Sequence, residues 1–392
     1  MKFKIYSLLL LLALMGCVSE FNANIPLSGT NILVVEGHIV ANSTVEFNFS
    51  KSFGLDEDYP PEGYDDVSVN LVIVGDDGSR SSYAEYMGSG VHRIDVGALD
   101  PNTAYGIEFE YEGNTYRSEL SKPLKTPEID EVTWVQPVKE GEVAIRVSTQ
   151  GDNSESHSYY LWDYMEDWEI TVNYPSAVFF DATTDPPYFY LDLSYPFLYC
   201  WKKYNNKDVL VGTTETLKEN KVVDKKLFSR EADDRFSYLY RVIVRQQAIS
   251  KAAYEYYLDK SKSNTGMGGL FTPQPSKIEG NITCITDNGK NVIGFVEVVN
   301  NIVEASMYIS STEVSIPPNY IDCDGQDFSD VTIYPTDMEP YLELYSYGFR
   351  PSSYVYLGDK PFATLWVKAR CTDCTAKGGV KRKPENWPND HE

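Results

Sequence analysis

The N-terminal part of the chain alternates apolar and polar residues with a period of two. Asn31–Val40 is an almost continuous apolar run, and the alternating runs that follow are Thr44–Ser50, Val67–Val74, Tyr105–Tyr111 and Thr115–Leu120. Because every second side chain of a strand lies on the same face, each run predicts a β-strand. Turn residues separate the runs, a pattern that is typical of an antiparallel sandwich. We therefore expect an antiparallel, immunoglobulin-like β-sandwich domain over residues 31–125.

A second β region begins after two prolines, Pro123 and Pro127, which favour a domain boundary. Alternation returns in Glu142–Thr149 and in Phe236–Gln246. The sequence therefore predicts a larger, mainly β domain over residues 126–392.

A hairpin is predicted late in this second region. Asp287-Asn288-Gly289 separates the apolar runs Asn281–Thr286 and Asn291–Val299. Asn-Gly is a preferred hairpin turn because both residues tolerate positive φ.

One helix is predicted over Ser250–Lys262, inserted between the strands. Ile249, Ala253, Tyr256 and Tyr257 fall on one helical face, and a glycine-rich segment follows. A helix this short is marginal in water by itself, so we expect this face to pack on the sheet of the second domain.

Residues 1–16 have the pattern of a secretory signal. They contain two lysines and no acidic residue, and the apolar run Leu8–Met15 is too short to span a bilayer. The small residue Gly16 precedes Cys17, as in lipoprotein signals, in which a lipid is attached to the cysteine thiol. The alternative is an ordinary signal peptide in which Cys17 has no role. We expect a lipoprotein signal over residues 1–16, lipidation of Cys17 and a tether over residues 17–30.

Composition excludes two classes of protein. The 392 residues contain 34 Lys and Arg against 58 Asp and Glu, a net charge of −24. Nucleic acid binding needs a basic surface that displaces counterions, so nucleic acid is not an expected partner. A hydrophobic content of 42% is too high for a disordered chain.

Five cysteines remain besides Cys17, and an exported chain is expected to oxidise them. These disulfide candidates are Cys200, Cys284, Cys323, Cys371 and Cys374. Because five is odd, at least one thiol stays unpaired in the monomer. Cys371 and Cys374 also have the spacing of a zinc knuckle or a redox pair, so zinc remains an alternative to a disulfide. The connectivity cannot be derived from the sequence.

A second metal candidate, for calcium, is an acidic loop around Gly325. Its carboxylates are Asp322, Asp324, Asp327 and Asp330. The spacing differs from that of an EF-hand, and the bidentate glutamate is missing, so a solvated acidic loop is the preferred interpretation. We therefore predict no metal and no cofactor.

Aromatic residues are abundant, with 30 Tyr, 17 Phe and 6 Trp. Most are expected in cores and cross-strand pairs. Residues 160–205 are rich in aromatics without a clean period, and Tyr and Trp suit a recognition surface. Trp162, Trp168, Tyr188 and Tyr190 are the ligand-binding candidates of this segment.

A search for catalytic motifs finds no G-x-S-x-G nucleophile elbow, no H-E-x-x-H pair and no phosphate-binding glycine-rich loop. His38, His92 and His157 lie in or beside strand patterns and are interpreted as ordinary sheet residues. The sequence therefore predicts that the protein is not an enzyme and has no catalytic residues.

Several segments together resemble the Bacteroidota outer-membrane lipoprotein family catalogued as domain of unknown function 4249 (DUF4249). The segments are Leu33–Gly37, Tyr199-Cys200-Trp201, Tyr240–Tyr257, Gly268–Ile282, Val292–Val298 and Cys371–Pro388. The resemblance implies a lipid-anchored outer-membrane protein, often encoded near TonB-dependent receptors. It implies no catalytic residue.

The favoured hypothesis is a non-enzymatic, surface-exposed lipoprotein that assists a TonB-dependent receptor in capturing an unknown nutrient. One alternative is a structural or adhesive envelope protein whose sandwich domains contact partner proteins. A secreted peptide or glycan hydrolase is the third hypothesis.

Overall fold

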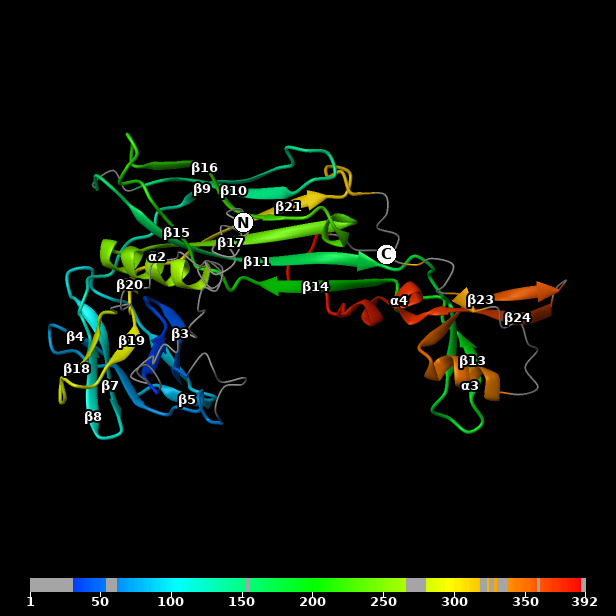
Figure 1. Cartoon of the computed structure of the whole chain (residues 1–392), viewed down its shortest axis with the longest axis horizontal. Coiled ribbons are helices and arrows are strands. Elements are labelled where there is room, and N and C mark those ends of the chain that lie inside the picture. The colour runs from blue at the N-terminus through cyan, green and yellow to red at the C-terminus, as the bar shows by residue number, and fades with distance from the viewer. Residues whose placement is uncertain are drawn as a thin grey trace, which may run out of the picture.

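The computed structural model describes residues 31–53, 62–151, 155–265, 280–317, 323, 328–329, 338–357 and 360–388. The described part is mainly β, with several antiparallel sheets and few helices (Figure 1). Three units follow from the strand pairing: an N-terminal sandwich, a central sandwich and a smaller lobe that we call the distal lobe.

The N-terminal sandwich consists of two facing sheets. One has the order β19-β1-β3-β6-β5, formed by Val292–Gly294, Leu33–Glu36, Ser43–Lys51, Val91–Val96 and Glu85–Gly88. The other has the order β18-β8-β7-β4, formed by Ile282–Cys284, Asn114–Ser118, Tyr105–Tyr111 and Asn70–Gly75. Phe49 and Phe109 meet between the sheets with ring centroids 5.0 Å apart. The alternating residues of the sequence thus form this core, as predicted.

Residues 281–299 were predicted to belong to the second domain, but they complete the first. β19 pairs in parallel with β1, β18 pairs with β8, and β20 (Val298–Val299) pairs in parallel with β2 (Ile39–Val40). The expected hairpin is also wrong, because β18 and β19 lie in different sheets of the sandwich. A turn motif predicts that the chain reverses locally. It does not predict which strands the two flanking segments pair with.

The central sandwich also has two sheets. One has the order β14-β11-β17-β21, formed by Tyr199–Asn205, Tyr159–Thr171, Leu239–Ala248 and Val303–Ser310, and β15 (Leu210–Thr213) also pairs with β11. The other has the order β16-β10-β9, formed by Lys221–Arg230, Val143–Gln150 and Ile129–Val135. The even-numbered aromatics of β11, including Tyr160, Trp162 and Tyr164, point into the core between the sheets. A short 3-10 helix, η1 (Asp234–Phe236), precedes β17.

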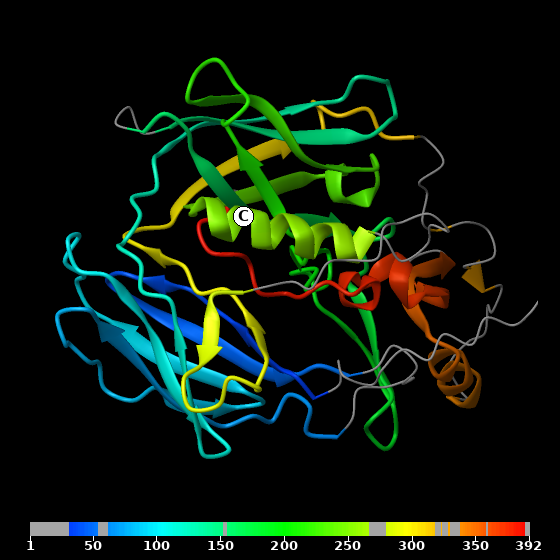
Figure 2. The same ribbon diagram turned by 60° about the vertical axis from the view of Figure 1, so that its left-hand side comes forward.

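Helix α2 (Lys251–Thr265) lies at the junction of the two sandwiches (Figure 2). The Ser250 hydroxyl accepts a hydrogen bond from the Ala253 N–H at 3.1 Å, which caps the first turn. The predicted apolar face is buried: Ile249, Ala253, Tyr256 and Tyr257 pack with Phe295. The helix contacts β11 and β15 of the central sheet, as expected, and through Phe295 it also contacts the segment that returns to the first sandwich.

The distal lobe combines a hairpin, a small sheet and short helices. The hairpin is β12 (Val178–Asp181) with β13 (Tyr188–Leu191), and the sheet order β22-β24-β23 comprises Phe328–Ser329, Lys360–Lys368 and Phe349–Leu357. The helices are α3 (Glu339–Ser346) and α4 (Ala369–Thr372). Phe180, Tyr341 and Trp366 form the buried centre of this lobe.

The chain then runs back along the central sheet as a C-terminal strap, residues 373–388, which begins with the 3-10 helix η3 (Cys374–Lys377). Val380 pairs with Trp201 of β14, and the buried indole of Trp387 donates to a Glu169 carboxylate oxygen at 3.2 Å. Arg241 donates to the Glu385 carbonyl at 2.7 Å. The strap thus covers polar residues on the outer face of the central sheet.

Candidate functional site

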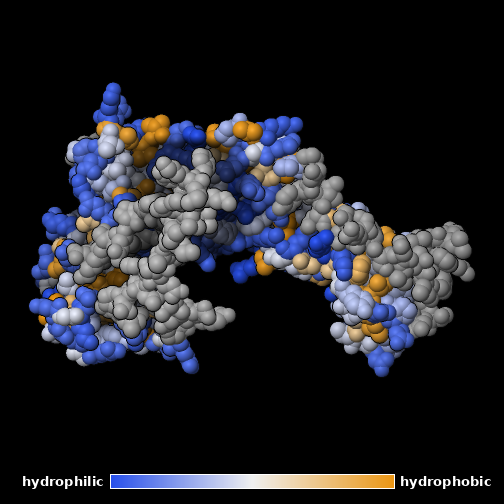
Figure 3. Space-filling model, in the orientation of Figure 1, coloured by the Kyte–Doolittle hydropathy of each residue, from blue (hydrophilic) through white to orange (hydrophobic). Residues whose placement is uncertain are grey.

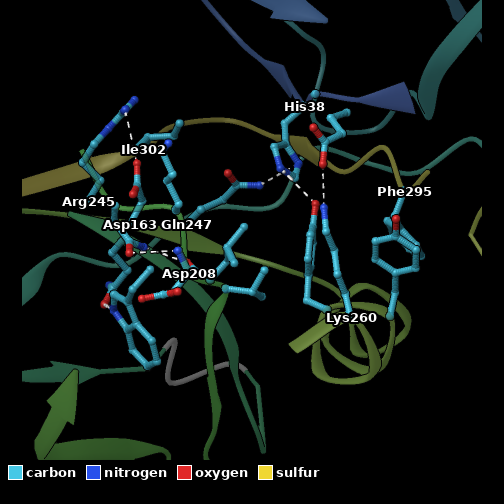
Figure 4. A pocket seen from close by; sticks show the side chains of 18 of the residues that line it. His38, Asp163, Asp208, Arg245, Gln247, Lys260, Phe295 and Ile302 are labelled. Atoms are coloured by element: carbon cyan, nitrogen blue, oxygen red, sulfur yellow. Dashed lines mark hydrogen bonds and ion pairs between the residues drawn. The ribbon is translucent and has the colours of Figure 1, made fainter. Parts of the chain in front are cut away.

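A pocket of about 370 Å³ opens where the N-terminal sandwich, the central sheet and helix α2 meet (Figure 4). Strand β1 contributes Glu36, the turn after it contributes His38, strand β17 contributes Gln247, and α2 contributes Tyr257 and Lys260. Segments more than 200 residues apart in sequence therefore supply one site. A concave site at a domain junction with a few convergent polar groups is a typical ligand-binding position.

His38 is held by two hydrogen bonds from different parts of the fold. Its Nδ1 lies 3.3 Å from Nε2 of Gln247, and its Nε2 lies 3.2 Å from the hydroxyl oxygen of Tyr257. With the Gln247 amide donating to Nδ1, the ring proton lies on Nε2 and faces the Tyr257 oxygen. Burial and the nearby charge of Lys260 lower the pKa of His38 to about 4, whereas Glu36 opposes this shift. The imidazole is therefore neutral at pH 7.

The backbone next to His38 requires glycine. Gly37 has φ 153°, and a Cβ on this residue would collide with the ring of Phe47. Phe47 is fully buried in the core of the first sandwich, so its ring cannot move aside. Gly37 thus lets the chain turn close to the core and present His38 to the pocket.

One wall of the pocket is an indole locked by a buried amide. Trp162 Nε1 donates to Gln246 Oε1 at 2.9 Å, and Gln246 Nε2 donates to the Pro127 carbonyl at 2.9 Å and to Thr149 Oγ1 at 3.1 Å. Because Gln246 is fully buried and these bonds occupy its amide, its role is to orient Trp162.

Charged residues of both signs stand around the pocket. Lys260 Nζ lies 2.6 Å from Glu36 Oε1, an ion pair that connects α2 with β1. Arg245 lies 3.1 Å from Glu304 and 3.8 Å from Asp163. The pocket is therefore lined by oppositely charged pairs and by amide groups, and neither sign of charge dominates it.

The remaining side of the pocket is a tight loop after β14. The Asp208 N–H donates to Asn206 Oδ1 at 2.9 Å, and Asn206 Nδ2 donates to the Asp208 carbonyl at 2.7 Å. Such an Asx turn holds the loop in one conformation. The described residues that line the pocket include no Ser, Thr or Cys; its polar side chains are those of His, Gln, Asn, Tyr, Asp, Glu, Lys and Arg.

The sequence did not single out these residues. His38 was interpreted as a sheet residue, and Gln247 and Tyr257 carried no motif. The one local signal is the Gly37-His38 pair, which interrupts the apolar run Asn31–Val40. By contrast, His92 is the predicted structural histidine: it is buried in β6 and accepts from the Val69 N–H at 3.0 Å.

The four aromatic candidates are not brought together. Trp162 and Trp168 are buried in the core of the central sandwich, at 1% and 8% exposure. Tyr188 and Tyr190 lie exposed on β13 of the distal lobe. The four residues therefore do not form one surface, because the alternation of β11 directs its even-numbered residues inward. Of the four, Trp162 is the one that lines the junction pocket.

The cysteines form two disulfides, Cys200–Cys374 and Cys323–Cys371. The odd thiol expected from the count is Cys284, which is buried in the first sandwich. Cys371 and Cys374 are each bonded to a distant cysteine and not to each other, so neither thiolate is free for the zinc alternative.

Two predicted sites lie outside the described residues. These are the lipidation site, Cys17, and the calcium candidate formed by Asp322, Asp324, Asp327 and Asp330. Among the residues that are described, no three His, Cys, Asp or Glu side chains are grouped to hold a metal ion. In the same residues, no helix has both the length and the apolar character needed to cross a bilayer.

A family model described as Domain of unknown function (DUF4249) matches residues 18–303. The chain belongs to this family. The match covers the N-terminal sandwich, strands β11, β14 and β17 of the central sheet, and α2, and therefore every described residue that lines the pocket. The cysteine-containing C-terminal segment Cys371–Pro388 lies beyond the matched residues. Among proteins with curated functions, none matches this chain.

Proposed function

We propose that this DUF4249 protein is a non-enzymatic lipoprotein of the outer membrane, exposed at the cell surface and anchored through Cys17. In this proposal it holds a small polar nutrient in the junction pocket and assists a TonB-dependent receptor in taking it up. The observation that carries the proposal is the pocket itself, in which His38, Gln247 and Tyr257 converge from three segments.

The chemistry of the lining supports binding of a polar molecule. The neutral His38 and the hydroxyl of Tyr257 provide hydrogen-bonding groups, while the buried side chains of Trp162 and Phe295 form part of the apolar wall. An apolar wall with a few fixed polar groups is typical of pockets for small ligands. The ion pair between Glu36 and Lys260 leaves no large uncompensated charge at this side, which favours a neutral or zwitterionic ligand.

The position of the pocket supports a role in capture and release. It lies between two sandwiches that are connected by side-chain contacts such as Glu36–Lys260 and His38–Gln247. Small relative movements of two domains change the shape of a pocket at their junction. The lipoprotein signal supports the proposed location, because Cys17 follows an apolar run with a small residue before it.

Native mass spectrometry tests the binding role. The purified protein without residues 1–17 is incubated with fractions of growth medium, and each bound species is read from the mass difference. We expect one small species to bind the wild type and to be lost from Gln247→Ala. Gln150→Ala is the matched control, because Gln150 is an exposed glutamine on β10 that does not line the pocket. Equal binding by Gln247→Ala, or no bound species in any fraction, would contradict the proposal.

A further inference from the structure

The hairpin β12–β13 of the distal lobe has aromatic residues on both faces. Phe180 and Phe189 are cross-strand partners on the inner face, where Phe180 packs on Trp366 with ring centroids 5.6 Å apart. Phe179 and Tyr190 are partners on the outer face, stacked with centroids 5.4 Å apart. Phe179 also contacts Phe197, with ring centroids 5.6 Å apart. A hairpin needs only one apolar face to pack on its own lobe, so the exposed Tyr188 and Tyr190 require another explanation.

Large side chains are exposed along β13 and in the segment after it. Tyr188 and Tyr190 lie on the outer face, whereas Leu191 pairs with Val178 on the other face. We define the hairpin patch as five exposed residues. Their exposed fractions are Tyr188 48%, Tyr190 43%, Leu191 59%, Leu193 75% and Tyr195 40%. These residues follow one another within eight positions, on the lobe at the right of Figure 1. Figure 3 shows hydrophobic residues interrupting the hydrophilic surface of this lobe. Large exposed side chains gathered within one short segment are typical of an interaction site.

The patch is held in a fixed shape before any partner binds. The Asp192 N–H donates to the Ala177 carbonyl at 2.9 Å, and the Leu198 N–H donates to the Tyr195 carbonyl at 3.0 Å. The disulfide at Cys200 lies just beyond the end of the segment. Tyrosines in a preformed arrangement lose little conformational entropy on binding.

The charge of the hairpin has one sign. Residues 172–201 contain Asp181, Asp185 and Asp192 and no Lys, Arg or His. Hydrogen bonds from Thr183 and Ser194 lower the pKa values of Asp181 and Asp192, respectively, so both are ionised at pH 7. Among the described residues, Lys381 brings a positive charge from another segment: its Nζ lies 3.8 Å from the centroid of the Phe197 ring, and it contributes to the lowered pKa of Asp192.

The negative charge of the hairpin argues against two of the surfaces that could bind the patch. A second copy of the chain would bring the same three carboxylates against the patch, between molecules of net charge −24. A membrane surface with anionic headgroups would repel the carboxylates, whereas membrane-binding segments carry Lys and Arg. We propose that the hairpin patch is the docking surface for a partner protein that presents an apolar recess rimmed by Lys or Arg.

Photo-crosslinking in cells tests this inference. Benzoylphenylalanine replaces Tyr190 in the full-length, lipidated protein, and in the control it replaces Tyr83, an exposed tyrosine (70%) of the N-terminal sandwich. We expect the Tyr190 position, and not the Tyr83 position, to cross-link to one protein other than this chain. The cross-linked peptide should carry Lys or Arg beside apolar residues. The yield should fall at least fivefold when Asp185→Lys and Asp192→Lys are added, because both reverse the complementary charge.

Cross-links to a second copy or to lipid, equal cross-linking at both positions, or no cross-link at Tyr190 would overturn the inference. Tyr190→Ser with Leu193→Ser checks it without a photoreactive group: both side chains are exposed, so the fold is retained while the partner is lost from purifications. The inference does not depend on what the pocket binds. It also does not depend on the partner being a TonB-dependent receptor, because any other protein cross-linked at Tyr190 would still support it.

Discussion

Cys374 is bonded to Cys200 with Cα atoms 5.6 Å apart, although 174 residues separate them. Cys200 lies in β14 of the central sheet, and Cys374 opens the C-terminal strap. The bond therefore fixes the strap against the sheet at the point where Trp387 and Val380 add their own contacts. The second disulfide, Cys323–Cys371, ties the distal lobe beside it.

Removal of the Cys200–Cys374 bond is expected to destabilise the protein. In Cys200→Ser with Cys374→Ser we expect a loss of about 2–5 kcal/mol in the free energy of unfolding, because the bond closes a long loop of the unfolded chain. Thiol titration of the denatured, unreduced protein lacking residues 1–17 checks the pairing. One reactive thiol, on Cys284, is expected, whereas three or more would show that a disulfide is missing.

Protonation of His38 is expected to weaken the fold at acidic pH. Its pKa is about 4 in the folded protein against 6.5 for an unperturbed histidine, so the unfolded chain binds more protons between these values. Stability is therefore lost as pH falls from about 6.5 to 4, by up to about 3 kcal/mol. Glu297 acts in the opposite direction, because burial raises its pKa and its protonation favours the folded state.

A comparison with His38→Gln separates these two contributions. The difference in urea midpoint between the wild type and His38→Gln should shrink as pH falls from 7 to 4, since the variant has no imidazole to protonate. A difference that stays constant with pH would mean that His38 is not desolvated as described.

Glu166 is expected to be far more important for stability than an exposed carboxylate in a similar pair. It is fully buried in β11 and accepts hydrogen bonds from Arg230 and from the Tyr240 hydroxyl, at 2.6 Å and 2.8 Å. Glu166→Gln should cost about 3 kcal/mol, because Arg230 keeps a partly buried charge without its counterion. Glu46→Gln is the control at the exposed Arg93 pair and should cost less than about 1 kcal/mol. Equal urea midpoints for the two variants would contradict this.

Local structure followed from the sequence more closely than tertiary pairing did. Thr44–Ser50 was predicted and β3 is Ser43–Lys51; Ser250–Lys262 was predicted and α2 is Lys251–Thr265. Both depend on the periodicity of neighbouring residues. Strands β18 to β20 pair with the N-terminal sandwich across about 160–260 residues of sequence. This pairing leaves no periodic pattern in either segment.

The site was the least predictable part for the same reason. His38, Gln247 and Tyr257 meet through hydrogen bonds between side chains that are 209 and 219 residues apart. Each is an ordinary residue in its own segment, and only the junction of the two sandwiches gives it a role. The exposed tyrosines of β13 were expected in a recognition surface, but the sequence could not separate them from the buried tryptophans of β11.

Purification of the lipidated protein from detergent-solubilised outer membranes tests the proposed function most directly. We expect a TonB-dependent receptor to be recovered with it in near-stoichiometric amount. We also expect Cys17→Ala to be lost from the membrane fraction and to recover no receptor. Recovery of the wild-type protein alone, or of Cys17→Ala still in the outer membrane with bound fatty acid, would contradict it.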